Sequence, residues 1–219
     1  MPDSLNSHEA RVLGVLIEKA FTTPDQYPLT LNALTNGCNQ KSNRSPKVDY
    51  GEAEVSVALD GLRFKHIAGA LTGGRAERWR HTALEHFDIS ERALAVLGEL
   101  LLRGAQPQGE LRTRASRMQP IGSLEELAET LRELQQAGFV QRIGPAPGSR
   151  AERWQQLLSE EDGQAAAATE KPRPSPSTRA PRIPDLEARV THLEQQLALL
   201  AKQLGVDLGA TSSPPQEEN

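Results

Sequence analysis

The polar segment at residues 38–47 combines positive charge with small hydrogen-bonding side chains. Its three cations, Lys41, Arg44 and Lys47, recur every third residue among Asn, Gln and Ser side chains. Lys and Arg neutralise phosphates, and amide or hydroxyl groups bind phosphate oxygens, so this composition suits the backbone of a nucleic acid. We therefore predict a phosphate-contacting loop here. The alternative is a solvated loop whose Asn and Ser side chains form local turns.

Further candidate phosphate contacts are arginines that the sequence pattern places on a short helix and on two hairpins. They are Arg75, Arg78, Arg112, Arg114, Arg150 and Arg153. Hairpin arginines can enter a minor groove or contact the DNA backbone. A structural role is nevertheless favoured on the hairpins, because the pentapeptide RAERW occurs at both 75–79 and 150–154. In that role each Arg stem packs on Trp and each Glu pairs across its hairpin. On the short helix, the alternative is an exposed ion pair with Glu110.

The sequence contains no arrangement typical of an enzyme. Its five histidines are scattered, and the single cysteine, Cys38, cannot supply a thiolate-rich zinc site. No Gly-rich phosphate loop follows a predicted strand. We therefore expect no enzymatic activity, no metal site and no cofactor. Cys38 is expected to be a small buried side chain rather than a reactive thiol.

The charge distribution argues against a strongly basic nucleic-acid module. Residues 1–87 and residues 88–158 each carry equal numbers of acidic and basic side chains, so the net charge of −4 arises in the C-terminal tail. Aromatic residues make up 4% of the chain, which leaves little for base stacking. One cysteine, no signal peptide and no apolar run of membrane-spanning length predict a cytoplasmic protein without a membrane partner.

The elements that must position these side chains follow one plan twice. In residues 4–87, the spacing of Asn6 and Glu9 predicts a capped helix, and a short second helix is expected from about Thr30. Asp49 and Glu52 predict the start of a third helix, and a hairpin follows between residues 67 and 79.

Residues 88–158 repeat this order. The spacing of Asp88 and Glu91 predicts the first helix, residues 110–118 the short helix, and the spacing of Ser123 and Glu126 the third helix. A hairpin with arms at 139–143 and 150–154 completes the unit. The predicted fold is mainly α with small β-hairpin wings (α+β), in two tandem winged-helix domains at 4–87 and 88–158.

Two groups of short motifs resemble a known family. The first group reads LIEK (16–19), TTPD (22–25), YPLTLN (27–32) and CNQKSNR (38–44), and the second LLLRG (100–104), GELRTR (109–114) and RM (117–118). Over residues 4–158 the chain is similar to the YceH-like family of bacterial proteins. The resemblance implies a tandem winged-helix fold and no established activity.

The remaining residues are predicted to form a linker, a coiled coil and a tail. Residues 159–182 are rich in Pro and Ala and are expected to be a disordered linker, and residues 206–219 a disordered tail. Between them, at 183–205, an unbroken heptad pattern predicts a helix that forms a homodimer. Its seam consists of Ile183, Leu186, Val190, Leu193, Leu197, Leu200 and Leu204. The alternative is a single amphipathic helix that folds back onto a domain.

Two functions are compatible with these observations. The first is a DNA-associated regulator that dimerises through its coil and contacts phosphate through the 38–47 loop and the wings. The second is a protein–protein adaptor whose winged helices bind other proteins without direct DNA binding. The predicted third helices favour the second, because acidic side chains repel phosphates. These acidic residues are Glu52, Glu54, Asp60, Glu125, Glu126, Glu129 and Glu133.

Overall fold

The computed structural model describes residues 4–73 and 76–159, which all belong to one compact unit. Within these residues the chain forms seven α-helices, one short 3-10 helix and two small antiparallel sheets. None of these helices is both long and apolar enough to cross a membrane. Of the linker predicted at 159–182 only Ser159 is described, and it forms an isolated β-bridge with Leu5. The rest of the predicted linker, the coiled coil and the tail lie outside the described residues.

The first half of the described chain, residues 4–87, contains three helices and a hairpin in the predicted order. Its elements are α1 (Ser7–Thr22), η1 (Pro24–Gln26), α2 (Leu31–Cys38), α3 (Glu52–Phe64), β1 (Ala68–Leu71), β2 (Arg78–His81) and α4 (Ala83–Phe87). The predicted cap of α1 is confirmed, because Asn6 and Glu9 each accept a hydrogen bond from the other's backbone N–H. Helix α2 begins next to Thr30, close to the predicted start, and Thr30 caps it by accepting from Ala33 N–H at 3.3 Å.

The second half, residues 88–158, repeats the order with one added strand. Its elements are α5 (Glu91–Arg103), β3 (Gln106–Pro107), α6 (Gln108–Ala115), α7 (Leu124–Gln136), β4 (Val140–Ile143) and β5 (Arg153–Gln156). Ser123 caps α7, as predicted. The short strand β3 was not predicted. It pairs with β5 and extends the hairpin to three antiparallel strands in the order β3–β5–β4.

Two predicted helix starts are wrong. Helix α3 begins after Gly51, whose N–H donates to Glu54 Oε2 at 2.8 Å, and Asp49 is not the cap. Helix α5 is capped by Ser90 instead of Asp88. Asp88 has a left-handed φ of 50° and ends the five-residue helix α4, which was also not predicted.

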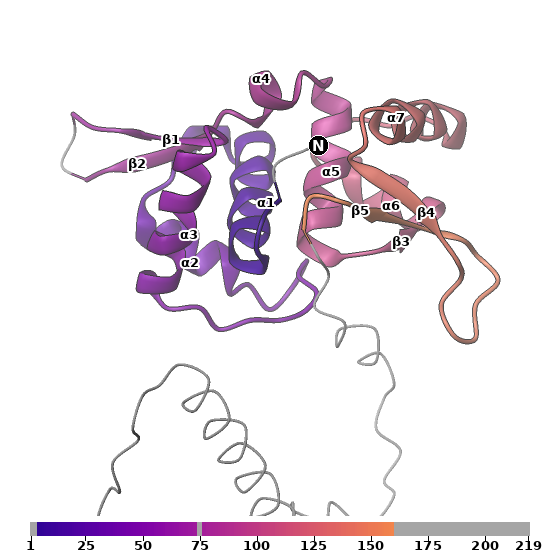
Figure 1. The fold of residues 1–219 in the computed structure, drawn as a ribbon, viewed down its shortest axis with the longest axis horizontal. Helices are drawn as coiled ribbons and strands as arrows, with labels where there is room; N and C mark the ends of the chain where they lie inside the picture. The colour runs from indigo at the N-terminus through magenta and orange to yellow at the C-terminus, as the bar shows by residue number, and fades with distance from the viewer. Residues whose placement is uncertain (1–3, 74–75, 160–219) are drawn as a thin grey trace, which may run out of the picture. The chain divides into compact units, whose positions relative to one another are not determined.

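The helices α1 and α5 lie side by side in the middle of the described chain, and the remaining elements of each half lie on either side (Figure 1). Glycines allow this close approach. A Cβ atom at Gly14 would lie 2.9 Å from Leu102 Cγ, and one at Gly98 would lie 2.7 Å from Ile17 Cγ2. One continuous apolar core therefore contains side chains of both halves, and the predicted domain boundary at residue 87 stays a prediction.

Every residue in 9–18 and in 93–102 is buried, so both central helices are enclosed on all sides. A helix in this position is normally apolar all round. Four charged residues break that rule, because each is buried: Glu9, Arg11 and Glu18 on α1, and Glu99 on α5.

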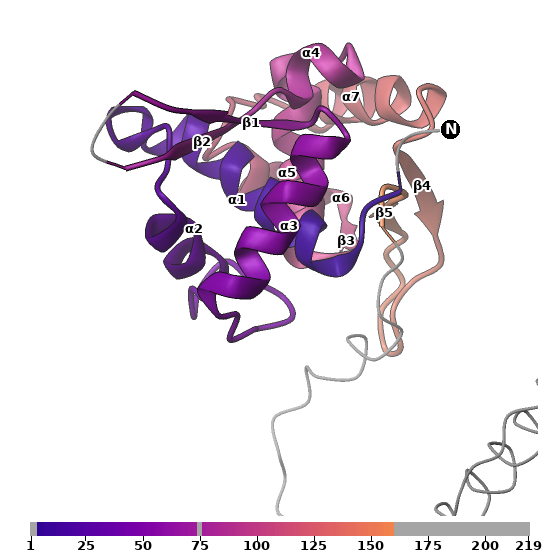
Figure 2. The ribbon, with the colours of Figure 1, turned by 60° about the vertical axis from the view of Figure 1, so that its left-hand side comes forward.

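The two tryptophans hold the hairpins to the rest of each half. Trp79 on β2 exchanges two backbone hydrogen bonds with Leu29, at 2.7 and 3.0 Å. Trp154 on β5 lies between strands β3 and β4. Both tryptophans are buried. The hairpin β1–β2 projects beyond the helices of the first half (Figure 2).

Candidate functional site

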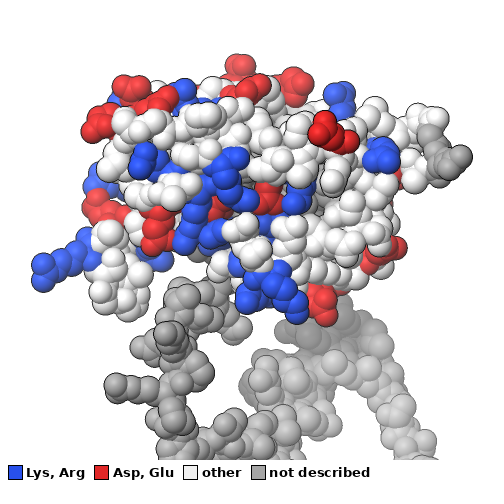
Figure 3. Space-filling model, turned by 180° about the vertical axis from the view of Figure 1, so that it is seen from behind, with Lys and Arg blue, Asp and Glu red and all other residues white. Residues whose placement is uncertain are grey.

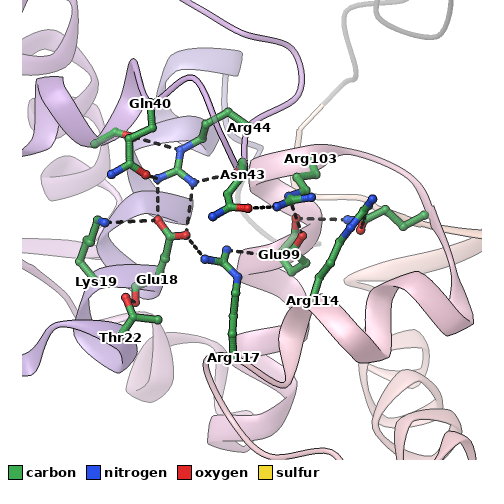
Figure 4. A network of polar contacts seen from close by, with 12 residues as sticks. Glu18, Lys19, Thr22, Gln40, Asn43, Arg44, Glu99, Arg103, Arg114 and Arg117 are labelled. Carbon is green, nitrogen blue, oxygen red and sulfur yellow. Dashed lines mark hydrogen bonds and ion pairs between the residues drawn. The ribbon is translucent and has the colours of Figure 1, made fainter. Parts of the chain in front are cut away.

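The buried carboxylates of α1 and α5 face each other across a group of basic side chains, which we call the junction cluster (Figure 4). The cluster consists of Glu18 and Lys19 on α1, Arg44 in the loop between α2 and α3, Glu99 and Arg103 on α5, and Arg117 in the turn after α6. Its members therefore come from both halves of the described chain.

Glu18 is the acceptor at the first-half side of the cluster. Its two oxygens accept from Arg44, at 2.5 Å from Nη2 and 3.3 Å from Nη1, and Arg117 Nη1 lies 2.5 Å from Oε1. Burial alone would raise the pKa of Glu18, but the hydrogen bonds and charges of Arg44 and Arg117 outweigh burial and lower it. Glu18 is therefore an ionised carboxylate at neutral pH.

Glu99 is the corresponding acceptor in the second half. Arg103 Nε lies 3.0 Å from Glu99 Oε1, and Arg117 Nη2 lies 3.1 Å from Oε2. Arg117 thus contacts Glu18 with one Nη atom and Glu99 with the other. A single guanidinium joins the two halves of the molecule.

Arg44 is buried, with no exposed side-chain surface. Besides Glu18, its N–H groups donate to Gly37 O at 3.0 Å, Gln40 Oε1 at 2.9 Å and Asn43 O at 2.8 Å. These contacts use all five N–H groups of a guanidinium. The expectation that Arg44 contacts phosphate is therefore wrong, because its charge is buried and paired inside the protein.

The loop that carries Arg44 is fastened at several points and is not simply solvated. Asn39 closes its base by exchanging two 2.8 Å hydrogen bonds with the backbone of Tyr50. Buried Arg11 donates to Pro46 O at 2.6 Å. Toward the second half, Ser45 N–H donates to Leu102 O at 2.9 Å, and the Asn43 side chain accepts from Arg103.

The two lysines of this loop, Lys41 and Lys47, are exposed. They are the members of the predicted cation trio that remain available to an external anion. The loop therefore has one buried cation with a structural role and two exposed cations.

Positive charge is in excess at the junction cluster. It contains four basic and two acidic side chains, so two positive charges are unmatched. Burial lowers the pKa of Arg103, and the charges of neighbouring arginines lower it further, although Glu99 opposes them. Crowded guanidiniums of this kind attract anions. Lys and Arg side chains also gather near the middle of the face shown in Figure 3.

The predicted arginines of the second half's short helix bind the chain itself. Arg112 Nη1 donates to Gly122 O at 3.2 Å. Arg114 lies 2.9 Å from Glu110, the ion pair considered as the alternative, and donates to Gln106 Oε1 at 2.6 Å.

The hairpin arginines also have local partners where the structure describes them. Arg78 donates to Pro28 O at 2.9 Å, and Arg153 Nε donates to Gly144 O at 3.2 Å. Glu152 pairs with Arg142 across the second hairpin, as the structural alternative expects. Arg150 is exposed, and Arg75 lies outside the described residues.

The remaining residues considered for chemistry are Cys38 and the possible metal ligands. Cys38 is fully buried, which confirms the predicted burial, and burial raises the pKa of its thiol to about 12. Within residues 4–73 and 76–159, no His, Cys, Asp and Glu side chains group closely enough to hold a metal ion.

The carboxylates at the centre of the cluster were not predicted from the sequence. A signal was present, because Glu18 follows Leu16 and Ile17, and Glu99 interrupts an apolar stretch at 93–102. A charged residue within an enclosed helix requires a partner, since an unpaired buried charge is strongly unfavourable.

Comparisons with known proteins assign the chain to a family. Residues 5–149 match the family described as "Protein of unknown function, DUF480". A protein of Geotalea daltonii named "UPF0502 protein" is 45% identical over 199 residues, covering 90% of this chain and 89% of the relative. Proteins of the same name from Pelobacter propionicus (46% over 205 residues; 90% and 94%) and Shewanella halifaxensis (41% over 211 residues; 91% and 96%) are similar. These matches do not test the YceH-like label or the winged-helix description, which stay predictions. The chain belongs to the DUF480, or UPF0502, family of bacterial proteins.

Proposed function

We propose that this protein is a non-enzymatic DNA-associated regulator, built from two winged-helix domains and dimerised through the heptad segment at 183–204. The repeated order of three helices and a hairpin supports the winged-helix assignment. Winged helices commonly bind DNA, but a fold alone does not establish a function. The proposal therefore depends on where the exposed cations lie.

The observation that carries the proposal is the position of the 38–47 loop, which contains Lys41 and Lys47. The contacts of Asn43 with Arg103 and of Ser45 with Leu102 hold this loop against the end of α5. Exposed Lys41 and Lys47 are thereby fixed on the same element that reaches the basic side chains of the second half. A surface with cations from two halves can contact phosphates that are several nucleotides apart.

The expected mode of binding is contact with the DNA backbone, without reading of the bases. Helix α3 exposes Glu52, Glu54 and Asp60, and α7 exposes Glu125 and Glu129. Carboxylates on a helix inserted into the major groove would meet phosphates on both sides. We therefore expect weak sequence preference and a strong dependence of affinity on salt.

The test is a salt titration of full-length protein on random duplex DNA. Replacing Lys41 and Lys47 together by Ala removes two phosphate contacts. The slope of log affinity against log salt should then flatten by about 1.8, since each neutralised phosphate contributes about 0.9. The matched control is Arg63→Ala with Arg132→Ala, which removes two exposed cations from α3 and α7. The control should leave the slope unchanged.

Two results would contradict the proposal. One is the absence of measurable binding by the wild-type protein at roughly 50 mM salt, the low end of the usual range. The other is an equal loss of slope in the loop variant and the control, because the effect would then reflect net charge alone.

A second candidate function is a protein–protein adaptor, and one observation on α3 favours it. Val57 and Phe64 are 71% and 86% exposed, which is unusual for large apolar side chains. Seven residues apart on one helix, they point in nearly the same direction. Helix α3 lies at the surface of the first half (Figure 2).

The charge of Asp60 indicates what kind of segment would bind this apolar pair. Asp60 lies between them on the same helix face, so the matching segment would carry two apolar side chains with a Lys or Arg between them. In nuclease-treated pull-downs, the pair of changes Val57→Asp and Phe64→Asp should abolish capture of such a partner. Capture that depends on nucleic acid, or that survives both changes, would exclude this face.

A further inference from the structure

We propose that a closed ring of side chains, formed by five members of the junction cluster and Asn43, positions Lys41 and Lys47 for contact with phosphate. This role rests on the proposed DNA binding and deepens it, because the ring residues hold the DNA-contacting loop without binding DNA themselves. The ring residues are, in order, Asn43, Arg103, Glu99, Arg117, Glu18 and Arg44.

One side of the ring runs from the 38–47 loop into the second half (Figure 4). The Asn43 side chain accepts a hydrogen bond from Arg103. Arg103 Nε lies 3.0 Å from Glu99, and Glu99 in turn accepts from Arg117 Nη2 at 3.1 Å. Basic and acidic side chains therefore alternate from the end of α5 to the turn after α6, and each charge has a partner of opposite sign.

The other side of the ring returns to the loop through the first half. Arg117 Nη1 lies 2.5 Å from Glu18, whose second oxygen accepts from Arg44 Nη2 at 2.5 Å. Arg44 directly follows Asn43, and its Nη1 donates to the Asn43 backbone oxygen at 2.8 Å. The loop is therefore held from both halves at two consecutive residues, and breaking any contact of the ring weakens that hold.

The two lysines lie on either side of these fixed residues. Lys41 precedes them by two residues and Lys47 follows them by three, and both side chains are exposed. The next residue is joined to α5 as well, because Ser45 N–H donates to Leu102 O at 2.9 Å. A loop held at three consecutive residues presents its lysines in one arrangement before DNA arrives. Less conformational freedom is then lost on binding, which raises affinity without further contacts.

A positioning role differs measurably from a phosphate contact. A side chain that neutralises a phosphate contributes about 0.9 to the slope of log affinity against log salt. A side chain that only holds the lysines changes affinity by the same factor at every salt concentration and leaves this slope unchanged. Arg117 is 28% exposed, so the slope decides whether it acts on the loop or on DNA itself.

The first measurement is amide hydrogen exchange of full-length protein without DNA, read by NMR. Asn43→Gly breaks the ring at the loop, and the φ of 60° at this position suits glycine. Arg117→Gln breaks the ring away from the loop and leaves each carboxylate one arginine. The Ser45 amide should exchange about fivefold faster in both variants, since its hold on α5 loosens. The Tyr50 amide, which donates to Asn39 at the base of the loop, should be unchanged if the fold is intact.

Two further variants make this measurement specific. Asn43→Asp keeps an acceptor for Arg103, so the Ser45 amide should exchange at the wild-type rate. Arg92→Gln removes an arginine from an Arg–Glu pair outside the ring, 2.7 Å from Glu126, and should also leave the Ser45 amide unchanged. Unchanged exchange of Ser45 in both ring variants, or equal acceleration in Arg92→Gln, overturns the proposal.

The second measurement is the salt titration on random duplex DNA. Asn43→Gly and Arg117→Gln should each weaken binding about fivefold at every salt concentration, with an unchanged slope. A slope that falls by about 0.9 in Arg117→Gln would make this residue a phosphate contact and overturn its positioning role. Ring variants that exchange faster but bind DNA as tightly as wild type would also overturn the proposal. If wild-type protein binds no DNA, the proposed function fails, and the exchange measurement alone decides whether the ring holds the loop.

Discussion

Replacing Arg44 by Ala is the sharpest test of the structural role of the 38–47 segment. The change removes five hydrogen bonds and leaves the buried Glu18 carboxylate with Arg117 and Lys19 as its remaining partners. Removing one partner of a buried ion pair typically costs 3–5 kcal/mol. Because Arg117 still lies 2.5 Å from Glu18, we expect the lower end of that range, about 3 kcal/mol.

The assay is urea unfolding followed by the fluorescence of the two buried tryptophans. With an m-value of about 2 kcal/mol per molar urea, the midpoint should fall by about 1.5 M. The control is Arg142→Ala, which breaks an Arg–Glu pair whose side chains are both 56% exposed and should cost less than about 1 kcal/mol. Arg44→Lys keeps the positive charge but loses the planar guanidinium with its five N–H donors, so it should recover only part of the stability. If Arg44→Ala and Arg142→Ala shift the midpoint equally, the structural role of Arg44 is refuted.

Three further predictions concern the hairpins, a buried histidine and the C-terminal segment. Trp79→Ala and Trp154→Ala should each lower the free energy of unfolding by roughly 3–5 kcal/mol, since both rings are buried, and thermal unfolding measures this loss. Burial lowers the pKa of His81 to about 4, so the unfolded chain takes up this proton first as the pH falls. The free energy of unfolding is therefore unaffected by His81 above about pH 6.5 and falls progressively toward pH 4, by at most about 2 kcal/mol at pH 5. The midpoint of urea unfolding at pH 7 and pH 5 should show this loss in wild type and a smaller one in His81→Phe. Leu193→Asp should convert a dimer into monomers in analytical ultracentrifugation, and a wild-type protein that is already monomeric would remove the predicted coil.

Local sequence patterns predicted a helix start correctly where the capping side chain itself forms the hydrogen bond. Asn6 and Ser123 both cap the predicted helices. The same spacing failed at Asp49 because Glu54, two residues beyond Glu52, caps the backbone N–H of Gly51 instead. A glycine cap has no side chain, so the pattern of a polar residue followed by Glu does not reveal it.

Long-range pairing explains why the sequence misidentified Arg44. The spacing of Lys41, Arg44 and Lys47 is typical of a phosphate loop, and all three looked alike in the sequence. The partner that distinguishes Arg44 is Glu18, which lies on α1, 26 residues earlier. Only the packing of α1 against α5 brings the second carboxylate, Glu99, within reach of the same group of arginines.

The small strand β3 was missed for a related reason. Its two residues, Gln106 and Pro107, carry no strand pattern of their own. They adopt extended backbone because β5 offers an edge for pairing, at Trp154 and Arg153. Such pairing is a property of the folded half rather than of the local sequence.

The location of the DNA-contacting surface can be measured directly by chemical modification of lysines, read by mass spectrometry with and without random duplex DNA at low salt. DNA bound to the proposed surface should protect Lys41 and Lys47 from modification. Lys65, which is paired with Glu9 at 2.6 Å on the first half, should keep its reactivity. Protection of Lys41 and Lys47 above that of Lys65 would support the proposal. Unchanged reactivity of both loop lysines, under conditions in which DNA is bound, would contradict it.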